Sequence, residues 1–343
     1  MRVRAWLWIA VAGLAAAAAL PLSACGGGSP TELVVLTHDS FDVNKDLLAG
    51  FEREHDAKVT ILKGGDANAM VNRAVLSAGK PEADVLFGVD NLSYQRALAA
   101  GVFAPYRAVR RGEVAAELRS QFGDAAELTP VDYGFVALNF DKKAGAPPKS
   151  FDELADAKWR GKLVVEDPAT SSPGLQFLAS TVAHFGEGKW QAFWRALRAN
   201  DVRVADGWET AYYRDFSPNG GDRPLVVSYT TSPAAEVFFA KQPISEPPTV
   251  NVIPGPLFRQ VEAVGVLKGA RHEALARAFV DFMLSDRFQA QIPETMFVYP
   301  VIAGLSTPEW WKWAQVDVKP ATIAASQPEI ERWISEWTSI MKR

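Results

Sequence analysis

The sequence predicts an α/β protein made of two lobes. Short apolar segments rich in β-forming residues alternate with amphipathic helical segments, an order that is typical of mostly parallel sheets. The dipeptide Pro147-Pro148 then opens a second run of the same kind. With 343 residues, 48% hydrophobic and 22% charged, the chain is long enough for one large domain or two of ordinary size.

The first lobe is expected to begin near residue 31 with three strand–helix pairs. Leu47, Leu48 and Phe51 recur at helical spacing, and Gly101 stands where a helix should stop. The predicted strands are residues 31–37, 58–62 and 83–89, and the predicted helices are residues 45–55, 69–78 and 91–100.

The rest of the chain continues the alternation of strands and helices. Trp190, Phe193, Trp194 and Leu197 fall at positions i, i+3, i+4 and i+7, which predicts a helix with an aromatic core face. A similar stripe over residues 329–341 predicts a terminal helix packed on the body of the protein. The other expected elements are strands at residues 133–140, 162–166, 224–229 and 261–267, and a helix at residues 272–284.

The N-terminus has the features of an export signal. Arg2 and Arg4 precede an uncharged apolar run over residues 5–20, which is short for a membrane span. The following Leu-Ser-Ala-Cys resembles a bacterial lipobox, so we expect residues 1–24 to be removed and Cys25 to be lipidated. Residues 25–30 would form a flexible tether holding the protein in the periplasm or on the outer face of the cytoplasmic membrane. An ordinary signal with an incidental cysteine is the alternative.

Composition and missing motifs exclude several classes of function. The net charge of −4 gives no basic surface for nucleic acid, and a single cysteine allows neither an intramolecular disulfide nor a cysteine-based zinc site. Acylation of Cys25 would also exclude a cysteine nucleophile. The chain has no dinucleotide or phosphate loop and no HExxH or GxSxG motif, and its four histidines are widely separated. We therefore expect no enzyme, no cofactor and no metal site.

Loops rich in small polar and aromatic residues follow most of the predicted strands. In open α/β sheets, ligands bind at the carboxyl ends of strands. Carboxylates and aromatic faces gathered there would suit a flat, cationic small molecule. The clearest of these loops contain His38-Asp39-Ser40, Gly65-Asp66, Asp206-Gly207-Trp208, Ser228-Tyr229-Thr230-Thr231-Ser232 and Phe297-Val298-Tyr299.

A series of motifs, in the same order over nearly all of the mature chain, resembles the thiamine-binding proteins of bacterial ABC importers. The motifs are His38-Asp39-Ser40-Phe41, Gly88-Val89-Asp90-Asn91, Asp132-Tyr133-Gly134, the run from Asp167 to Gly174, Gly207-Trp208-Glu209-Thr210-Ala211-Tyr212, Ser228-Tyr229-Thr230-Thr231-Ser232-Pro233 and Tyr299-Pro300-Val301. The resemblance implies a type II periplasmic-binding-protein fold, with hinge crossovers and a ligand cleft between the lobes. Residues 31–135 and 255–343 would form the first lobe, and residues 136–254 the second.

The same resemblance implies a monomer that captures thiamine or thiamine phosphates and delivers them to an ABC permease and its ATPase. Asp66 would lie near the cationic ligand, Trp208 would stack on it, and Ser171 and Tyr229 would complete the cleft. Asp66 as a helix cap and Trp208 as a core ring are the structural alternatives. The full set of expected ligand-binding residues is His38, Asp39, Ser40, Asp66, Asp90, Asp132, Tyr133, Ser171, Trp208, Tyr229, Ser232, Phe297 and Tyr299.

Three positions depart from the pattern of that family. His38 stands where a tyrosine is usual, Ala235 replaces a second cleft tyrosine, and Phe297 replaces a tryptophan. These departures predict a roomier, less aromatic site. Competing interpretations are a ferric-ion-binding protein that uses the adjacent Tyr212 and Tyr213, a polyamine or phosphate binder, and a purely structural surface lipoprotein. Thiamine-degrading transferases of similar fold act through a cysteine, which this chain lacks outside Cys25.

Overall fold

The computed structural model describes residues 29–123, 125–317, 320–321 and 325–342. The predicted signal peptide at residues 1–24 and the predicted lipidation site Cys25 lie outside the described residues. Residues Thr31–Arg343 form one compact unit. No helix in the described part of the chain is both long enough and apolar enough to cross a membrane.

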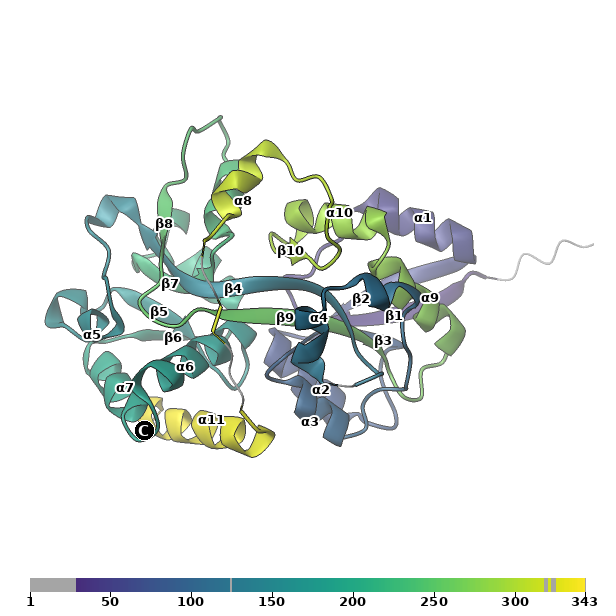
Figure 1. The fold of residues 1–343 in the computed structure, drawn as a ribbon, viewed down its shortest axis with the longest axis horizontal. Helices are drawn as coiled ribbons and strands as arrows, with labels where there is room; N and C mark the ends of the chain where they lie inside the picture. The colour runs from purple at the N-terminus through teal and green to yellow at the C-terminus, as the bar shows by residue number, and fades with distance from the viewer. Residues whose placement is uncertain (1–28, 124, 318–319, 322–324, 343) are drawn as a thin grey trace, which may run out of the picture. The chain divides into compact units, whose positions relative to one another are not determined.

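A ten-stranded mixed sheet runs through this unit (Figure 1). Its order is β2-β1-β3-β9-β4-β7-β5-β6, and β8 and β10 also pair with β4. The three strands at each end are parallel, whereas the long central strands pair antiparallel with each other and with their neighbours β3 and β7. The strands are β1 (Thr31–Thr37), β2 (Ala57–Lys63), β3 (Val85–Asp90), β4 (Thr129–Asp141), β5 (Leu163–Glu166), β6 (Arg203–Ala205), β7 (Leu225–Tyr229), β8 (Thr249–Val252), β9 (Phe258–Val266) and β10 (Tyr299–Pro300).

The first core lies around β1, β2 and β3. Leu33, Phe51, Phe87 and Phe279 are buried in it. Asn44 begins the first helix by accepting hydrogen bonds from two backbone N–H groups with its side-chain oxygen. The helices on this side are α1 (Lys45–His55), α2 (Ala67–Leu76), α3 (Tyr94–Ala99), α4 (Ala116–Arg119), α9 (Glu273–Met283) and α10 (Asp286–Thr295).

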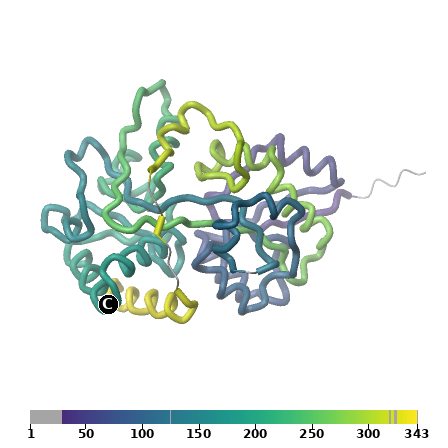
Figure 2. The backbone as a smooth tube through the Cα atoms, viewed as in Figure 1, coloured from purple at the N-terminus to yellow at the C-terminus, as the bar shows by residue number. Residues whose placement is uncertain are grey.

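The second core lies around β5 and β7 and contains the predicted tryptophan stripe. Trp190 and Trp194 are buried, and the Trp194 ring meets Trp337 of the last helix edge-on at 5.5 Å. Figure 2 shows this yellow C-terminal helix beside the teal segment that contains α7. The helices on this side are α5 (Phe151–Leu154), α6 (Ser172–Phe185), α7 (Trp190–Ala199), α8 (Ser232–Phe238) and α11 (Gln327–Met341).

The short helical turns connect these elements. The π-helical turn η5 (Thr210–Asp215) contributes residues to the candidate site, and π-helical turns are frequent at functional positions. The 3-10 turns are η1 (Val109–Glu113), η2 (Ser120–Phe122), η3 (Lys142–Ala144), η4 (Ala157–Trp159), η6 (Ser217–Asn219) and η7 (Glu309–Ala314).

The two cores differ from the predicted lobes at the C-terminus. The expected boundaries assign residues 255–343 to the first lobe, whereas α11 packs on α7 in the second core. The reason is the aromatic stripe itself, because Trp333 and Trp337 find their apolar partners around Trp194. The expected mostly parallel sheet is confirmed at its two ends, but the long antiparallel strands β4 and β9 cross between them.

Candidate ligand-binding site

A cavity of about 590 Å³ opens where residues from both cores meet. The loop after β1, the start of α2 and the loop after α10 contribute from the first core. The starts of α6 and α8, the end of β7 and the η5 turn contribute from the second. The lining residues used below are His38, Asp39, Ser40, Asp42, Asp66, Trp208, Glu209, Tyr212, Tyr213, Tyr229, Thr231, Ser232, Ala235, Glu236, Phe239, Glu262 and Phe297.

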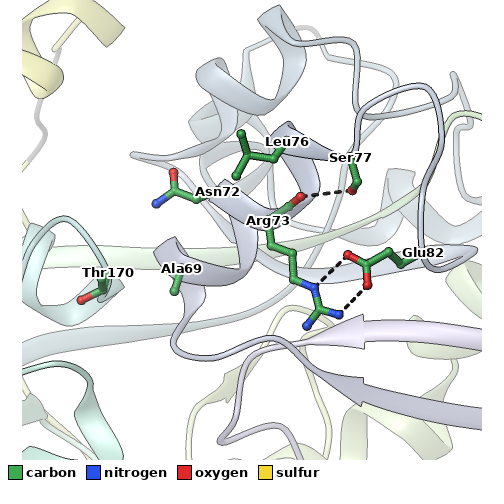
Figure 3. Close-up of a pocket in the computed structure, with 7 residues that line it drawn as sticks. All are labelled: Ala69, Asn72, Arg73, Leu76, Ser77, Glu82 and Thr170. Atoms are coloured by element: carbon green, nitrogen blue, oxygen red, sulfur yellow. Dashed lines mark hydrogen bonds and ion pairs between the residues drawn. The ribbon is translucent and has the colours of Figure 1, made fainter.

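A second hollow, of about 450 Å³, lies on the outer side of α2 (Figure 3). Within this hollow, Arg73 Nε donates a hydrogen bond to Glu82 Oε1 at 2.9 Å. Leu76 in this hollow is 89% exposed. None of the predicted ligand-binding residues lines it, so the 590 Å³ cavity is the candidate site.

Trp208 forms the aromatic wall of the cavity. Its ring stacks on Tyr212 with centroids 5.0 Å apart and an interplanar angle of 17°. Tyr212 follows Trp208 by four positions, and the η5 turn that contains it brings the two rings together. The indole N–H donates to Ser228 Oγ at 2.8 Å, which fixes the ring plane. Tyr229 meets the indole edge-on at 6.3 Å. One indole face is therefore covered by Tyr212, and the ring is held in place by the protein alone.

Asp66 joins the two sides of the cavity. It is the N-cap of α2, and its Oδ1 accepts from the Ala67 N–H at 2.6 Å. Its Oδ2 accepts from the backbone N–H of Trp208 at 2.7 Å. Burial raises the pKa of Asp66, although both backbone hydrogen bonds oppose this. Gly207 permits the close approach, because a Cβ there would lie 2.8 Å from Asp66 Oδ2.

His38, Glu262 and Asp132 form a charged group at the inner end of the cavity. His38 Nε2 lies 3.6 Å from Glu262 Oε2, and Asp132 pairs opposite Glu262 on the adjacent strands β4 and β9. Although burial favours the neutral imidazole, the Glu262 carboxylate raises the pKa of His38. Burial and the nearby Glu262 raise the pKa of Asp132 well above its usual value. The pKa of Glu262 is lowered instead: burial opposes this shift, and the neighbouring His38 drives it.

Glu236 is a third carboxylate in the cavity wall. Its Oε1 accepts from the Tyr212 hydroxyl at 2.8 Å and its Oε2 accepts from Thr249 Oγ1 at 2.6 Å. Burial raises the pKa of Glu236, and the two hydroxyl donors oppose that rise. Glu236 thus connects the stacked Tyr212–Trp208 pair to strand β8.

Most of the predicted ligand-binding residues line the cavity. Phe297 does so with a left-handed backbone, φ 54°, and its ring contacts Phe239 at 5.0 Å. A bulky side chain at positive φ is strained, and such strain is most often found at functional sites. The predicted residues that line the cavity are His38, Asp39, Ser40, Asp66, Trp208, Tyr229, Ser232 and Phe297.

The other five predicted residues lie outside the lining. Asp90 is fully buried and accepts from the Leu92 and Ser93 N–H groups at 2.8 and 2.7 Å. Ser171 is the buried N-cap of α6, and Asp132 lies behind Glu262. Tyr133 and Tyr299 stack on each other at 5.1 Å. Four of these residues lie within strands and Ser171 caps a helix, so they contribute to the framework around the cavity and not to its lining.

Sequence reasoning missed several residues that line the cavity. Glu209, Glu236, Phe239 and Glu262 were not among the predicted ligand-binding residues. Glu262 left a signal, since it is the one charged residue within the apolar run 261–266. Glu236 and Phe239 left none, because helix α8, which contains Glu236 and ends just before Phe239, was not predicted.

The described residues contain no group of three or more histidine, cysteine, aspartate or glutamate side chains placed to hold a metal ion. Tyr212 and Tyr213, the pair considered for ferric ion, both line the cavity. Their rings are 5.4 Å apart and nearly perpendicular, with an interplanar angle of 89°. Tyr212 is 5% exposed, whereas Tyr213 is 56% exposed.

The chain is similar to several bacterial periplasmic binding and iron uptake proteins. The thiamine-binding periplasmic protein of Escherichia coli K12 is 30% identical over 323 residues, which cover 91% of this chain and 94% of that protein. The solved structure of a periplasmic thiamin binding protein superposes with a TM-score of 0.77 at 26% identity, covering 91% of this chain and 96% of the other. Iron uptake protein A2 of Synechocystis is 29% identical over 253 residues, 70% of each chain.

The family model described as bacterial extracellular solute-binding protein matches residues 80–320. That range includes β3 to β10 and therefore parts of both cores and most of the cavity wall. The chain belongs to the family of bacterial extracellular solute-binding proteins.

Proposed function

We propose that this chain captures thiamine in the 590 Å³ cavity and delivers it to an ABC importer outside the cytoplasmic membrane. The observation that carries the proposal is the combination of a fixed aromatic wall with buried carboxylates. Thiamine joins an aminopyrimidine ring to a cationic thiazolium ring, and such rings favour aromatic faces and negative charge. Trp208 would provide the face, and Asp66 and Glu262 would provide the charge.

The contacts across the cavity suggest how capture works. Asn68 Nδ2 donates to the carbonyls of Pro168 and Ser171 at 3.1 and 3.2 Å, and Ser172 Oγ donates to Asp90. Each of these bonds joins the first core to the second, as does the bond from Trp208 to Asp66. They would form when the second core, including α11, closes on the first core, and ligand binding would shift the population toward that closed state. The ligand would be held without chemical conversion.

The location of the protein is part of the same proposal. A solute-binding protein must meet its ligand outside the membrane and hand it to a permease that is driven by a cytoplasmic ATPase. We expect the monomeric protein to be held there by lipid on Cys25. Replacement of Cys25 by serine should move the protein from the membrane fraction to the soluble fraction and abolish labelling by radioactive palmitate. Retention of label in that variant would contradict lipidation at Cys25.

Calorimetric titration tests the ligand. The chain from Gly26 onward would be unfolded and refolded to remove any bound ligand, and then titrated with thiamine. We expect one site with a dissociation constant below about 1 µM, equivalent to about 8 kcal/mol. Trp313→Ala is a matched control for tryptophan variants, because Trp313 does not line the cavity. Absence of heat from a folded sample would contradict thiamine as the ligand.

Ferric ion is the second candidate, and one observation favours it. Tyr212, Tyr213 and Glu236 line the same cavity, and phenolate and carboxylate oxygens are the ligands that Fe(III) prefers. Addition of ferric citrate to the stripped protein would then produce a visible tyrosinate charge-transfer band. A titration with spermidine tests the polyamine alternative in the same sample. Binding of thiamine without a colour change would support the main proposal.

A further inference from the structure

The loop after β1 forms one wall of the cavity. All five of its residues, 38–42, line the cavity. Phe41 is the one member that is buried, and its ring packs on Phe87 with centroids 5.2 Å apart. The polar members His38, Asp39 and Ser40 therefore depend on the backbone of this short loop for their positions around a ligand.

The side chain of Lys63 lies against this loop. Lys63 is the last residue of β2, and it pairs with Thr37, the last residue of β1, in the parallel register of the two strands. Its ammonium donates to the carbonyls of His38 at 3.4 Å and Asp39 at 2.9 Å, and also to the carbonyl of Phe41. A lysine ammonium has three N–H donors, so all three are used on one short loop.

Two of these carbonyls depend on Lys63 alone. In the described part of the chain, no other group donates to the carbonyls of Asp39 and Phe41. The loop has one further tie to its neighbour, because the Asp39 N–H donates to the Gly65 carbonyl at 2.9 Å and the Gly65 N–H donates to Asp39 Oδ1 at 3.1 Å. Lys63 and Gly65 thus join the loop after β1 to the loop after β2, which carries Asp66.

Lys63 itself is not one of the residues that line the cavity. Burial lowers the pKa of Lys63, and the nearby acids Glu209, Asp39 and Asp42 oppose that change. Its positive charge disfavours a cationic ligand, because like charges repel. The charge of Lys63 and its hydrogen bonds to the loop therefore act on the affinity for a cation with opposite signs.

We propose that Lys63 is a positioning residue, which holds residues 38–42 in the shape that receives the ligand. This inference rests on the proposed function and extends it to a residue that does not touch the ligand. Without Lys63 the ligand has to order the loop as it binds, and the conformational entropy lost in that step lowers the affinity. Lys63→Met removes the three donors and keeps most of the apolar stem. Thiamine should then bind about tenfold more weakly, although loss of the charge alone would make it bind more tightly.

Calorimetric titration with thiamine compares the wild type with three variants. Lys63→Met should bind more weakly, and Lys63→Arg, which keeps the charge and the N–H donors, should lie closer to the wild type. Lys80→Met is the matched control, because Lys80 is an exposed lysine outside the cavity. Unchanged or tighter binding by Lys63→Met would overturn the inference and leave the thiamine proposal intact. Failure of the folded wild type to bind thiamine would instead overturn the proposed function.

Small cations separate hydrogen bonding from charge. In Lys63→Ala, methylammonium can donate N–H groups to the carbonyls that the lysine leaves, whereas tetramethylammonium carries the same charge and has no N–H. At matched ionic strength, methylammonium should restore part of the lost thiamine affinity and tetramethylammonium should not. Equal effects of the two cations on this variant would overturn the assignment of hydrogen bonding to the loop.

Hydrogen exchange tests the loop without any ligand. The backbone N–H groups of Asp39 and Phe41 both form hydrogen bonds. In Lys63→Met both should exchange at least about tenfold faster than in the wild type, because the loop opens more often, whereas the amides of the central strand β9 should not change. Equal exchange at Asp39 and Phe41 in the two proteins would show that the loop keeps its shape without the lysine. That result would overturn the inference whatever ligand the cavity takes.

Discussion

Replacement of Trp208 by alanine is the perturbation that bears most directly on the aromatic wall. One face of the indole is covered by Tyr212 at 5.0 Å, and its N–H is held by Ser228 at 2.8 Å. The ring is thus fixed before any ligand arrives, and its remaining surface borders the cavity. Alanine removes this surface, the ring that stacks on Tyr212 and the N–H that Ser228 accepts.

The expected loss can be estimated from the contacts that a cationic ring would make. A desolvated cation–π contact is worth about 2 kcal/mol, and an aromatic pair about 0.5–1.5 kcal/mol beyond its buried area. Loss of about 2 kcal/mol corresponds to roughly thirtyfold weaker binding. Trp208→Phe keeps an aromatic face and loses the bond to Ser228, so its affinity should fall by less than about tenfold.

The assay is calorimetric titration with thiamine, accompanied by circular dichroism and thermal unfolding of each variant. Trp313→Ala serves as the control and should bind like the wild type. A folded Trp208→Ala protein that binds thiamine within about threefold of the wild type would refute the reasoning, because the indole would then be a packing residue alone.

Four further predictions concern charge, backbone and packing. Asp66→Asn leaves one acceptor oxygen for two backbone N–H groups and removes a negative charge, so thiamine affinity measured by calorimetry should fall by about tenfold or more. Gly207→Ala forces a Cβ to within 2.8 Å of Asp66 Oδ2 and should weaken binding similarly, whereas wild-type affinity would show that the loop moves aside. The pKa values of His38 and Asp66 are both raised, so acidification adds positive charge at His38 and removes negative charge at Asp66. Thiamine affinity measured by calorimetry should therefore be lower at about pH 5 than at about pH 8. An affinity that does not change with pH would contradict this. Trp337→Ala opens a cavity against Trp194 and should lower the free energy of unfolding in urea by about 3–5 kcal/mol without changing thiamine affinity per folded molecule.

The regular part of the fold could be predicted from the sequence because its patterns are local. The strand at residues 31–37 and the helix at residues 45–55 occupy the expected ranges, and the stripe from Trp190 to Leu197 is buried as its spacing indicates. Helix α10 was not predicted, since Pro293 stands inside it and proline ordinarily marks the end of a helix. The position of α11 was also missed, because helical spacing defines an apolar face and not the partner of that face.

Sequence patterns identified those site residues that lie at the boundary of a helix or strand and also face the cavity. Asp66 is the example, since it is the helix cap that its sequence context indicates and also lines the cavity. Ser171 has the same capping pattern but is fully buried, and no local signal separates the two. Glu262 became part of the site through the pairing of β9 with β4, which joins residues 130 positions apart in the chain. Such long-range pairings set the charge of the cavity, and local sequence patterns do not reveal them.

A crystal structure of the chain from Gly26 onward in complex with thiamine would test the central claim most directly. We expect one thiamine in the 590 Å³ cavity, with an aromatic ring of the ligand against Trp208, its positive charge within reach of Asp66 or Glu262, and its hydroxyl near Thr231. Density for thiamine outside this cavity, or a cavity that holds a different ligand while thiamine is present in excess, would contradict the claim.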